Sequence, residues 1–116
     1  TSAFPISAVG HSLIVIRSNK YRQLPMFISN ANSFSCDYIV RQKLGGTNMT
    51  YGYVMQFPIL PPNTYTHPAC LLLGKSLTSC VLELLYTSYS LQPFAKDCGY
   101  DGPPFIWDEE RRFEIR

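Results

Sequence analysis

Apolar residues dominate the middle of the chain, where no Asp, Glu, Lys or Arg occurs between Lys43 and Lys75. Within this segment, residues 51–60 alternate large and variable side chains and end in an aromatic-Pro-aliphatic-aliphatic run. An uncharged stretch this rich in aromatic and aliphatic residues is most simply a buried one. We therefore predict a central β-strand here, whose regular ladder ends at Pro58 because proline has no N–H to donate.

Near the start of the chain, four aliphatic residues recur at nearly helical spacing, which predicts a helix over residues 5–17 with one apolar face: Ile6, Val9, Leu13 and Ile16. The later apolar runs are short and are separated by turn residues such as Gly45-Gly46 and Gly74-Lys75-Ser76, a pattern typical of strands joined by hairpins. We expect these strands at residues 23–29, 36–44, 50–60, 69–73 and 79–87.

The run from Cys80 to Tyr86 suits a helix by the intrinsic propensity of its leucines, but its short length between turn signals favours a strand. The predicted fold class is therefore α+β, with one N-terminal helix packed on a curved antiparallel sheet of about four to five strands. A chain of 116 residues, 46% hydrophobic and 16% charged, is expected to form one domain, residues 1–116, with its own core. We place that core within about residues 5–98, followed by a charge-dense C-terminal extension, residues 99–116.

Charge and hydropathy exclude several classes of partner. The formal net charge of +2 is too small to predict binding to nucleic acid or to a membrane surface. No run of 18 apolar residues occurs, so we predict no membrane span. The sequence begins at Thr1 without a starting Met or a signal peptide, which is expected of a mature or trimmed form.

The four cysteines are Cys36, Cys70, Cys80 and Cys98. None lies in a C-x-x-C pair and the two histidines are far away in sequence, so a zinc site is not expected. An even number in a small chain fits one or two disulfides and a secreted protein, and four buried free thiols are the alternative. Sequence alone does not choose among the three connectivities. Cys70 facing Cys80 across a hairpin would leave Cys36 to pair with Cys98.

Candidate catalytic residues are few and scattered. His11 and His67 have no carboxylate at a spacing that makes an acid–base pair. Glu83 lies in an apolar run, where a lone acid faces solvent or pairs with an arginine such as Arg41. The Arg111-Arg112 pair is flanked by acids, which predicts a solvated face of mixed charge rather than a phosphate site. Without a Gly-rich phosphate loop or a nucleophile beside a base, we expect no enzyme, no cofactor and no metal.

The run Gln56-Phe57-Pro58-Ile59-Leu60 resembles the aromatic-Pro-Ile-Leu strand of small fungal guanyl-type ribonucleases. It resembles more closely the RNase-like secreted effectors of cereal powdery mildew fungi, which share that fold. The expected order of elements agrees over residues 5–98: an amphipathic helix, a short strand with an internal proline (Leu24-Pro25-Met26-Phe27), the strand ending at Pro58, a loop, two more strands and a late cysteine, Cys98. The resemblance implies a microbial ribonuclease-like fold.

The resemblance also implies that the catalytic groups are lost. The position of the enzymes' glutamate base corresponds to Gln56, an amide that cannot accept a proton at neutral pH. Met26 stands where these enzymes carry a histidine after the proline of the early strand. Tyr86 and Thr87 occupy the region of the second histidine, and residues 69–72 lack the arginine. The resemblance thus implies a pseudo-ribonuclease with no catalytic residue.

The function implied by the resemblance is that of a fungal avirulence or virulence effector. Such a protein is secreted by the fungus, delivered into the host cell, and binds host plant proteins, among them an intracellular immune receptor. We expect a monomer that does not bind RNA, and we expect contacts through residues 29–50, 61–67 and the extension, because tyrosine, tryptophan and arginine suit protein interfaces. The candidate contact residues are Tyr65, His67, Tyr100, Trp107, Arg111 and Arg112.

Three alternatives remain open at this stage. One is an active ribonuclease with a rearranged site built from His67, Glu83 or Arg41. Another is RNA binding without cleavage, which would weaken steeply with salt. The third is an unrelated small extracellular β-rich binding domain.

Overall fold

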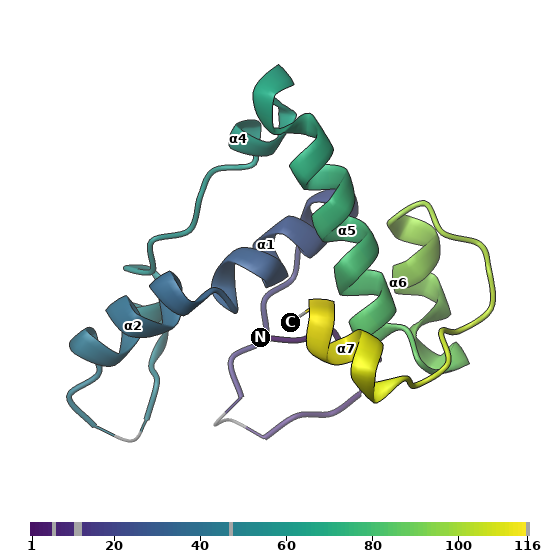
Figure 1. The fold of residues 1–116 in the computed structure, drawn as a ribbon. Coiled ribbons are helices and arrows are strands. Elements are labelled where there is room, and N and C mark those ends of the chain that lie inside the picture. The colour runs from purple at the N-terminus through teal and green to yellow at the C-terminus, as the bar shows by residue number, and fades with distance from the viewer. Residues whose placement is uncertain (6, 11–12, 47, 116) are drawn as a thin grey trace.

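A computed structural model describes residues 1–5, 7–10, 13–46 and 48–115, and these residues form a helical protein (Figure 1). Helices make up 57% of the structure and the described residues contain no strand, so the predicted α+β fold with a curved antiparallel sheet is wrong. In chain order the elements are η1 (Tyr21–Gln23), α1 (Leu24–Ala31), α2 (Phe34–Lys43), α3 (Tyr51–Val54), α4 (Asn63–Thr66), η2 (Pro68–Cys70), α5 (Leu71–Leu85), η3 (Tyr89–Leu91), α6 (Gln92–Asp97) and α7 (Glu109–Ile115).

The predicted strands fall on helices. Residues 23–29 lie mostly in α1, residues 36–44 lie mostly in α2, and the two strands expected at 69–73 and 79–87 lie mostly in the single helix α5. The predicted N-terminal helix is also wrong for the residues described between 5 and 17, which carry no helix. Ile6, His11 and Ser12, which belonged to that prediction, lie outside the described residues.

Local chemistry explains why α1 and α2 are helices. Pro25 sits in the first turn of α1, where its missing N–H has no helical partner to lose. Ser33 caps α2, because its hydroxyl accepts a hydrogen bond from the Cys36 N–H at 3.2 Å. Asp37 in the first turn and Arg41 in the last complement the helix dipole and form an ion pair at 2.7 Å.

The central strand predicted for residues 51–60 is wrong in both conformation and burial. These residues form the single turn of α3 and then irregular backbone, and none of residues 51–60 is buried. Tyr51 and Met55 are among the exposed large apolar side chains of the described chain.

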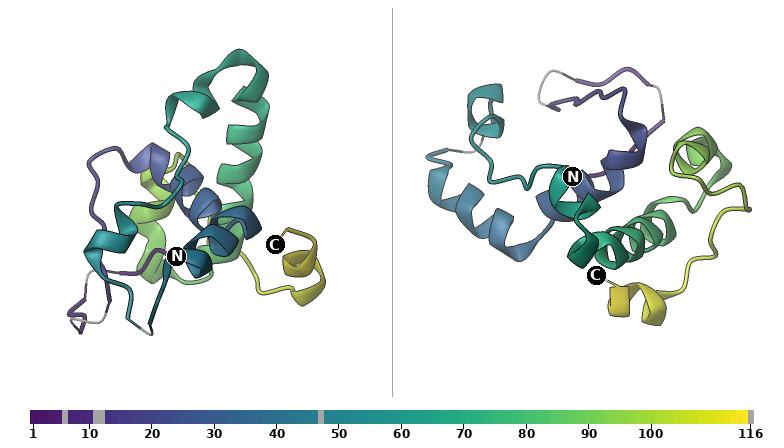
Figure 2. Two further views of the ribbon diagram at one scale, coloured as in Figure 1. Left: turned by 90° about the vertical axis from the view of Figure 1, so that its left-hand side faces the viewer. Right: turned by 90° about the horizontal axis from the view of Figure 1, so that it is seen from above.

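The centre of the structure is α5, the longest helix (Figures 1 and 2). Helix α1 packs across it, α4 and α7 contact it elsewhere, and α2 extends away beyond α1. Gly74 lies at one of these contacts, where a Cβ would be 3.4 Å from the Tyr65 carbonyl oxygen on α4, an ordinary van der Waals distance. The Gly74-Lys75-Ser76 hairpin turn expected from the sequence is thus the interior of a helix.

The hydrophobic core lies between the end of α5 and α6. Leu82, Tyr86 and Ala95 are buried together. Partly buried residues from the following segments pack against them: Leu91, Phe94, Cys98, Tyr100 and Phe105.

One helix, Pro68–Leu85, is long and apolar enough to cross a membrane by length and composition, with 17% of the window buried inside the structure. This span contains Lys75 and Glu83, so it was not expected from a search for an uninterrupted apolar run. Length and composition are weak evidence for a membrane span, because the core helix of a soluble protein passes the same test.

Candidate functional site

Several residues expected at the partner-binding surface instead pack the C-terminal segment against the rest of the structure. Tyr100 stacks on Phe105 with ring centroids 5.0 Å apart and meets the edge of Tyr86 at 6.0 Å. The Phe105 N–H donates to the Tyr86 carbonyl at 2.8 Å. Gly99, at φ +90°, turns the chain out of α6. Tyr100 is therefore a packing residue.

Arg111 on α7 forms a bidentate ion pair with Glu83 on α5. Its Nε and Nη2 donate to the two carboxylate oxygens of Glu83 at 2.8 and 3.2 Å, and Nη1 reaches Glu114 at 3.3 Å. Hydrogen bonds to both acids, first to Glu83, raise the pKa of Arg111. Glu83 does pair with an arginine, but the partner is Arg111, so the pairing suggested with Arg41 is wrong.

Arg112 is buried, so the expectation that both arginines lie on a solvated face is wrong for this residue. Its Nη2 donates to the Leu84 carbonyl at 3.0 Å, and its guanidinium carbon lies 3.7 Å from the centre of the Trp107 ring. The Arg112 Nε is buried without a hydrogen-bond partner among the described residues. Trp107 itself donates to Glu109 at 3.0 Å and stays exposed on its other side.

The two remaining contact candidates differ in exposure. Tyr65 is buried against α5, and burial raises its pKa. His67 is exposed, and its Nδ1 accepts a hydrogen bond from the Ala69 N–H at 3.3 Å as the cap of η2. Of the six candidate contact residues, only His67 and Trp107 therefore present an exposed ring.

The positions compared with ribonuclease catalytic residues do not converge on a site. Met26 lies on α1 and accepts a hydrogen bond from the Thr78 hydroxyl of α5 at 3.8 Å. Gln56 is exposed just after α3 and donates to the Gly52 carbonyl at 3.0 Å. Tyr86 is enclosed in the core, where burial raises its pKa, and Thr87 follows it on the surface. The described residues form no sheet that would align these positions.

The rearranged ribonuclease site is not assembled either. Arg41 pairs with Asp37 on α2, Glu83 pairs with Arg111, and His67 caps η2. The three residues thus have structural partners in three separate places, on α2, on α7 and in η2. Among the residues that the structure describes, no group of three or more His, Cys, Asp or Glu side chains is placed to hold a metal ion.

All four cysteines are free thiols in the structure, so the expected disulfides are not formed. Cys70 and Cys80 lie ten residues apart along one helical stretch, which separates their backbones by about 15 Å, well beyond disulfide reach. Burial raises the pKa of Cys36 and, together with the nearby Asp97 charge, raises that of Cys98 to about 11. A raised pKa keeps a thiol protonated and poorly nucleophilic.

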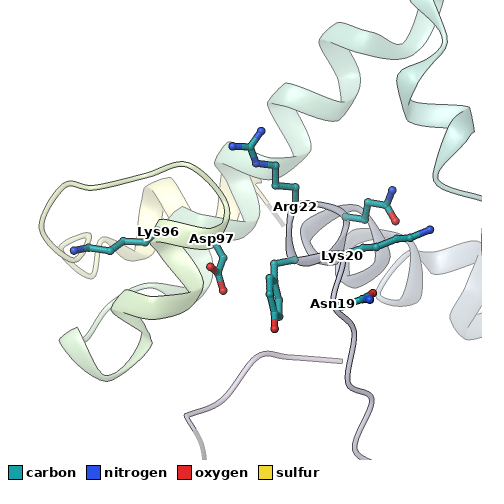
Figure 3. Close-up of a pocket in the computed structure, with 7 residues that line it drawn as sticks. Asn19, Lys20, Arg22, Lys96 and Asp97 are labelled. Atoms are coloured by element: carbon teal, nitrogen blue, oxygen red, sulfur yellow. The ribbon is translucent and has the colours of Figure 1, made fainter.

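One hollow on the described surface is open and polar, with a volume of about 460 Å³, and its lining includes Lys20, Arg22, Lys96 and Asp97. Figure 3 shows Lys20 and Lys96 extending in opposite directions from the η1 and α6 sides. Cations that diverge around a carboxylate do not form an anion site.

A surface that the sequence reasoning missed lies at the start of α5, which projects from the body together with α4 (Figure 1). The side chains of Leu71, Leu72 and Leu73 are 46%, 80% and 53% exposed. We call these three residues the leucine end. Pro68 three residues before the first of three consecutive leucines is typical of a helix start, and that pattern was interpreted as a buried strand.

Comparisons with known proteins found no matching family model, no matching curated protein and no matching solved structure. The function must therefore be argued from the surfaces of this chain.

Proposed function

We propose that this chain is a non-catalytic protein-binding module that docks through the leucine end of α5. The observation that carries the proposal is the simultaneous exposure of Leu71, Leu72 and Leu73. Successive residues of a helix point about 100° apart, so three in a row cover more than half of its circumference. A surface helix normally hides one apolar face against its own core. This turn packs on α4 at Gly74 and leaves its three leucines from about half to mostly exposed.

The overall dimensions support the same proposal. The accessible surface is 8604 Å², whereas a compact folded chain of this mass exposes about 6,400 Å². The radius of gyration is 15.0 Å, against about 13 Å for a compact domain of this length. One partner in a standard interface buries about 800 Å². The chain therefore has more than enough excess surface for such an interface.

The chemistry around the leucine end specifies the partner. Lys75 is the first charged residue after these leucines, and it is exposed. A matching partner surface has an apolar groove rimmed by acidic side chains. A membrane fits less well, because exposed Lys75, Ser76 and Ser79 follow within the same helix and Glu83 is held by Arg111.

The effector function is one form that such a binding module can take. The ribonuclease-like fold that led to it is absent, so secretion by a fungus, entry into a plant cell and recognition by an immune receptor stay predictions without support from the fold. Of the predicted effector function, we retain only non-catalytic binding to another protein.

The proposal is tested by placing a photocrosslinking amino acid at position 72 in cells that express the chain, then rebuilding the captured complex from purified components. Burying a leucine side chain contributes about 1.5–3 kcal/mol, so Leu72→Gln is expected to weaken the rebuilt complex by about tenfold or more. Phe34→Gln is the matched control, because Phe34 on α2 is 91% exposed and lies outside the leucine end.

Three results would contradict the proposal. They are equal losses of affinity in the Leu72 and Phe34 variants, crosslinks only between copies of this chain, and binding of the purified chain to lipid vesicles that Leu72→Gln abolishes. The last result would assign the leucine end to a membrane.

A further inference from the structure

An apolar groove lies beside α1, and none of the three leucines of the leucine end lines it. It has a volume of about 350 Å³, at the small end of the range of about 300–1,000 Å³ that is typical of ligand pockets. Its apolar walls come from the segment before η1, from α1, from the irregular segment before α4 and from α4 itself: Ile16, Leu24, Phe27, Ile59, Leu60 and Tyr65.

The walls of this groove are tied together by side-chain hydrogen bonds. The Leu60 N–H donates to Asn30 Oδ1 at 3.1 Å, which fixes the segment before α4 against the end of α1. The amino terminus donates to Asn32 Oδ1 at 2.6 Å, and Asn32 Nδ2 returns a hydrogen bond to the Thr1 carbonyl at 2.7 Å. Residue 1 thus lies against Asn32, the C-cap of α1.

The charged residues of the groove have one sign. Arg17 and Lys20 line it, and no acidic residue does. Neither side chain forms an ion pair within the residues that the structure describes. The first 60 residues carry five Lys and Arg residues and a single acid, Asp37, which is already paired with Arg41. The apolar groove is therefore lined by two cationic residues that form no ion pair with the described residues.

Tyr65 supplies an independent observation. Its side chain is 6% exposed and lines the groove, yet its hydroxyl has no hydrogen-bond partner in the described part of the chain. The only fully enclosed polar side-chain atom without a partner among these residues is the Arg112 Nε, so the Tyr65 hydroxyl keeps some access to solvent. A buried phenol normally finds an acceptor, and the groove is the opening that its residue lines.

We propose that this groove binds a small amphiphile with an aliphatic chain and a carboxylate head. The chain would fill the apolar volume against Phe27 and Leu60. The carboxylate would accept a hydrogen bond from the Tyr65 hydroxyl and charge-assisted hydrogen bonds from Arg17 and Lys20. A neutral or cationic head would leave both cations unmatched.

The test compares two probes with the same alkyl chain and opposite head charge, octanoate and octyltrimethylammonium. Each is titrated below its micellar concentration into isotopically labelled protein, and the backbone amide shifts are followed by NMR. Octanoate is expected to bind saturably, to shift the amides of Phe27 and Leu60, and to bind about tenfold or more tightly than the cationic probe. Arg17→Gln and Tyr65→Phe are expected to raise the octanoate Kd several-fold.

Lys43→Gln is the matched control, because Lys43 is an exposed cation at the end of α2 that does not line the groove. The proposal is overturned if octanoate does not saturate, if the two probes bind equally, or if Arg17→Gln and Lys43→Gln change Kd by the same factor. It is also overturned if the chain binds vesicles of anionic lipid but not free octanoate. Arg17 is exposed, so its variant remains informative if Tyr65→Phe perturbs folding.

Discussion

The segment from Leu82 to Phe105 and the segment from Leu24 to Leu60 bury their apolar side chains very differently. In the first, the described residues form a continuous core around Leu82, Tyr86 and Ala95. In the second, Ile28, Cys36 and Val40 are buried, while many large apolar side chains are exposed: Phe34, Tyr38, Ile39, Met49, Tyr51, Met55 and Leu60. Apolar content is thus a poor guide to where this chain builds its core.

The difference comes from what each segment can pack against. The end of α5, α6 and the turn after Cys98 are close in sequence, so their side chains meet with little loss of loop entropy. Helix α2 packs on α1 and extends away from α5, whereas α4 contacts the far end of α5 (Figure 1). We infer that the C-terminal region is the stable unit and that the N-terminal region opens more easily.

The largest expected difference between the two regions comes from the same substitution made once in each. Leu82 is 5% exposed and Leu60 is 48% exposed. Leu82→Ala is expected to lower the free energy of unfolding by about 2–5 kcal/mol, since it leaves a cavity among packed side chains. Leu60→Ala removes a half-exposed side chain and is expected to lower it by less than about 1 kcal/mol. Urea denaturation measures both, and equal losses would show that the two regions share one core.

The sequence carried some of this information. The glycines and prolines after Cys98 lie in irregular backbone between α6 and α7, where they act through local backbone preferences, and Gly99 has φ +90°. The signals of α2 were also present: Ser33 as a cap, Asp37 at the start and Arg41 at the end. The alternation of Tyr38 and Val40 with Ile39 and Arg41 was interpreted as a strand, although the capping residues indicate a helix.

The remaining errors depend on contacts between distant residues. Gly74 indicated a turn, but it lies inside α5 and packs on Tyr65 of α4, a neighbour that no local pattern contains. The absence of charge in residues 51–60 indicated burial, but burial is decided by which elements pack together. Arg112 was expected in solvent because of its charged neighbours, and it is buried by Trp107 and the end of α5. The leucine end and the α1 groove are likewise products of this packing.

Removing one ion pair from each region is expected to give a smaller difference in stability. Glu83 is 21% exposed and receives both prongs of Arg111, whereas Asp37 is 52% exposed and forms a single contact with Arg41 within α2. Glu83→Gln is expected to destabilise the protein more than Asp37→Asn, because the pair between helices is better shielded and fastens α7 to α5. Thermal unfolding at low and high salt measures both variants. A larger loss for Asp37→Asn would contradict the structural role given to the Arg111 contact.

The smallest expected effect on stability comes from the Cys98 thiol, because only the protonation of one side chain changes. Cys98 packs on the C-terminal core, and burial raises its pKa from the ordinary 9.0 to about 11. In the unfolded chain this thiol loses its proton near pH 9.0, while in the folded chain it keeps the proton until about pH 11. The unfolded state therefore binds fewer protons in this window, and stability falls as the pH rises from 9.0 to about 11.

Cys98→Ala removes this contribution, so its free energy of unfolding is expected to fall less steeply with pH over the same window. Tyr65 and Tyr86 also have raised pKa values and stay in both proteins, so the difference between the two slopes isolates Cys98. Urea denaturation of the reduced proteins below and within the window measures that difference. Identical slopes would mean that Cys98 is as accessible to water in the folded chain as in the unfolded one, and that the core around α6 is looser than the packing of Tyr86 and Ala95 indicates.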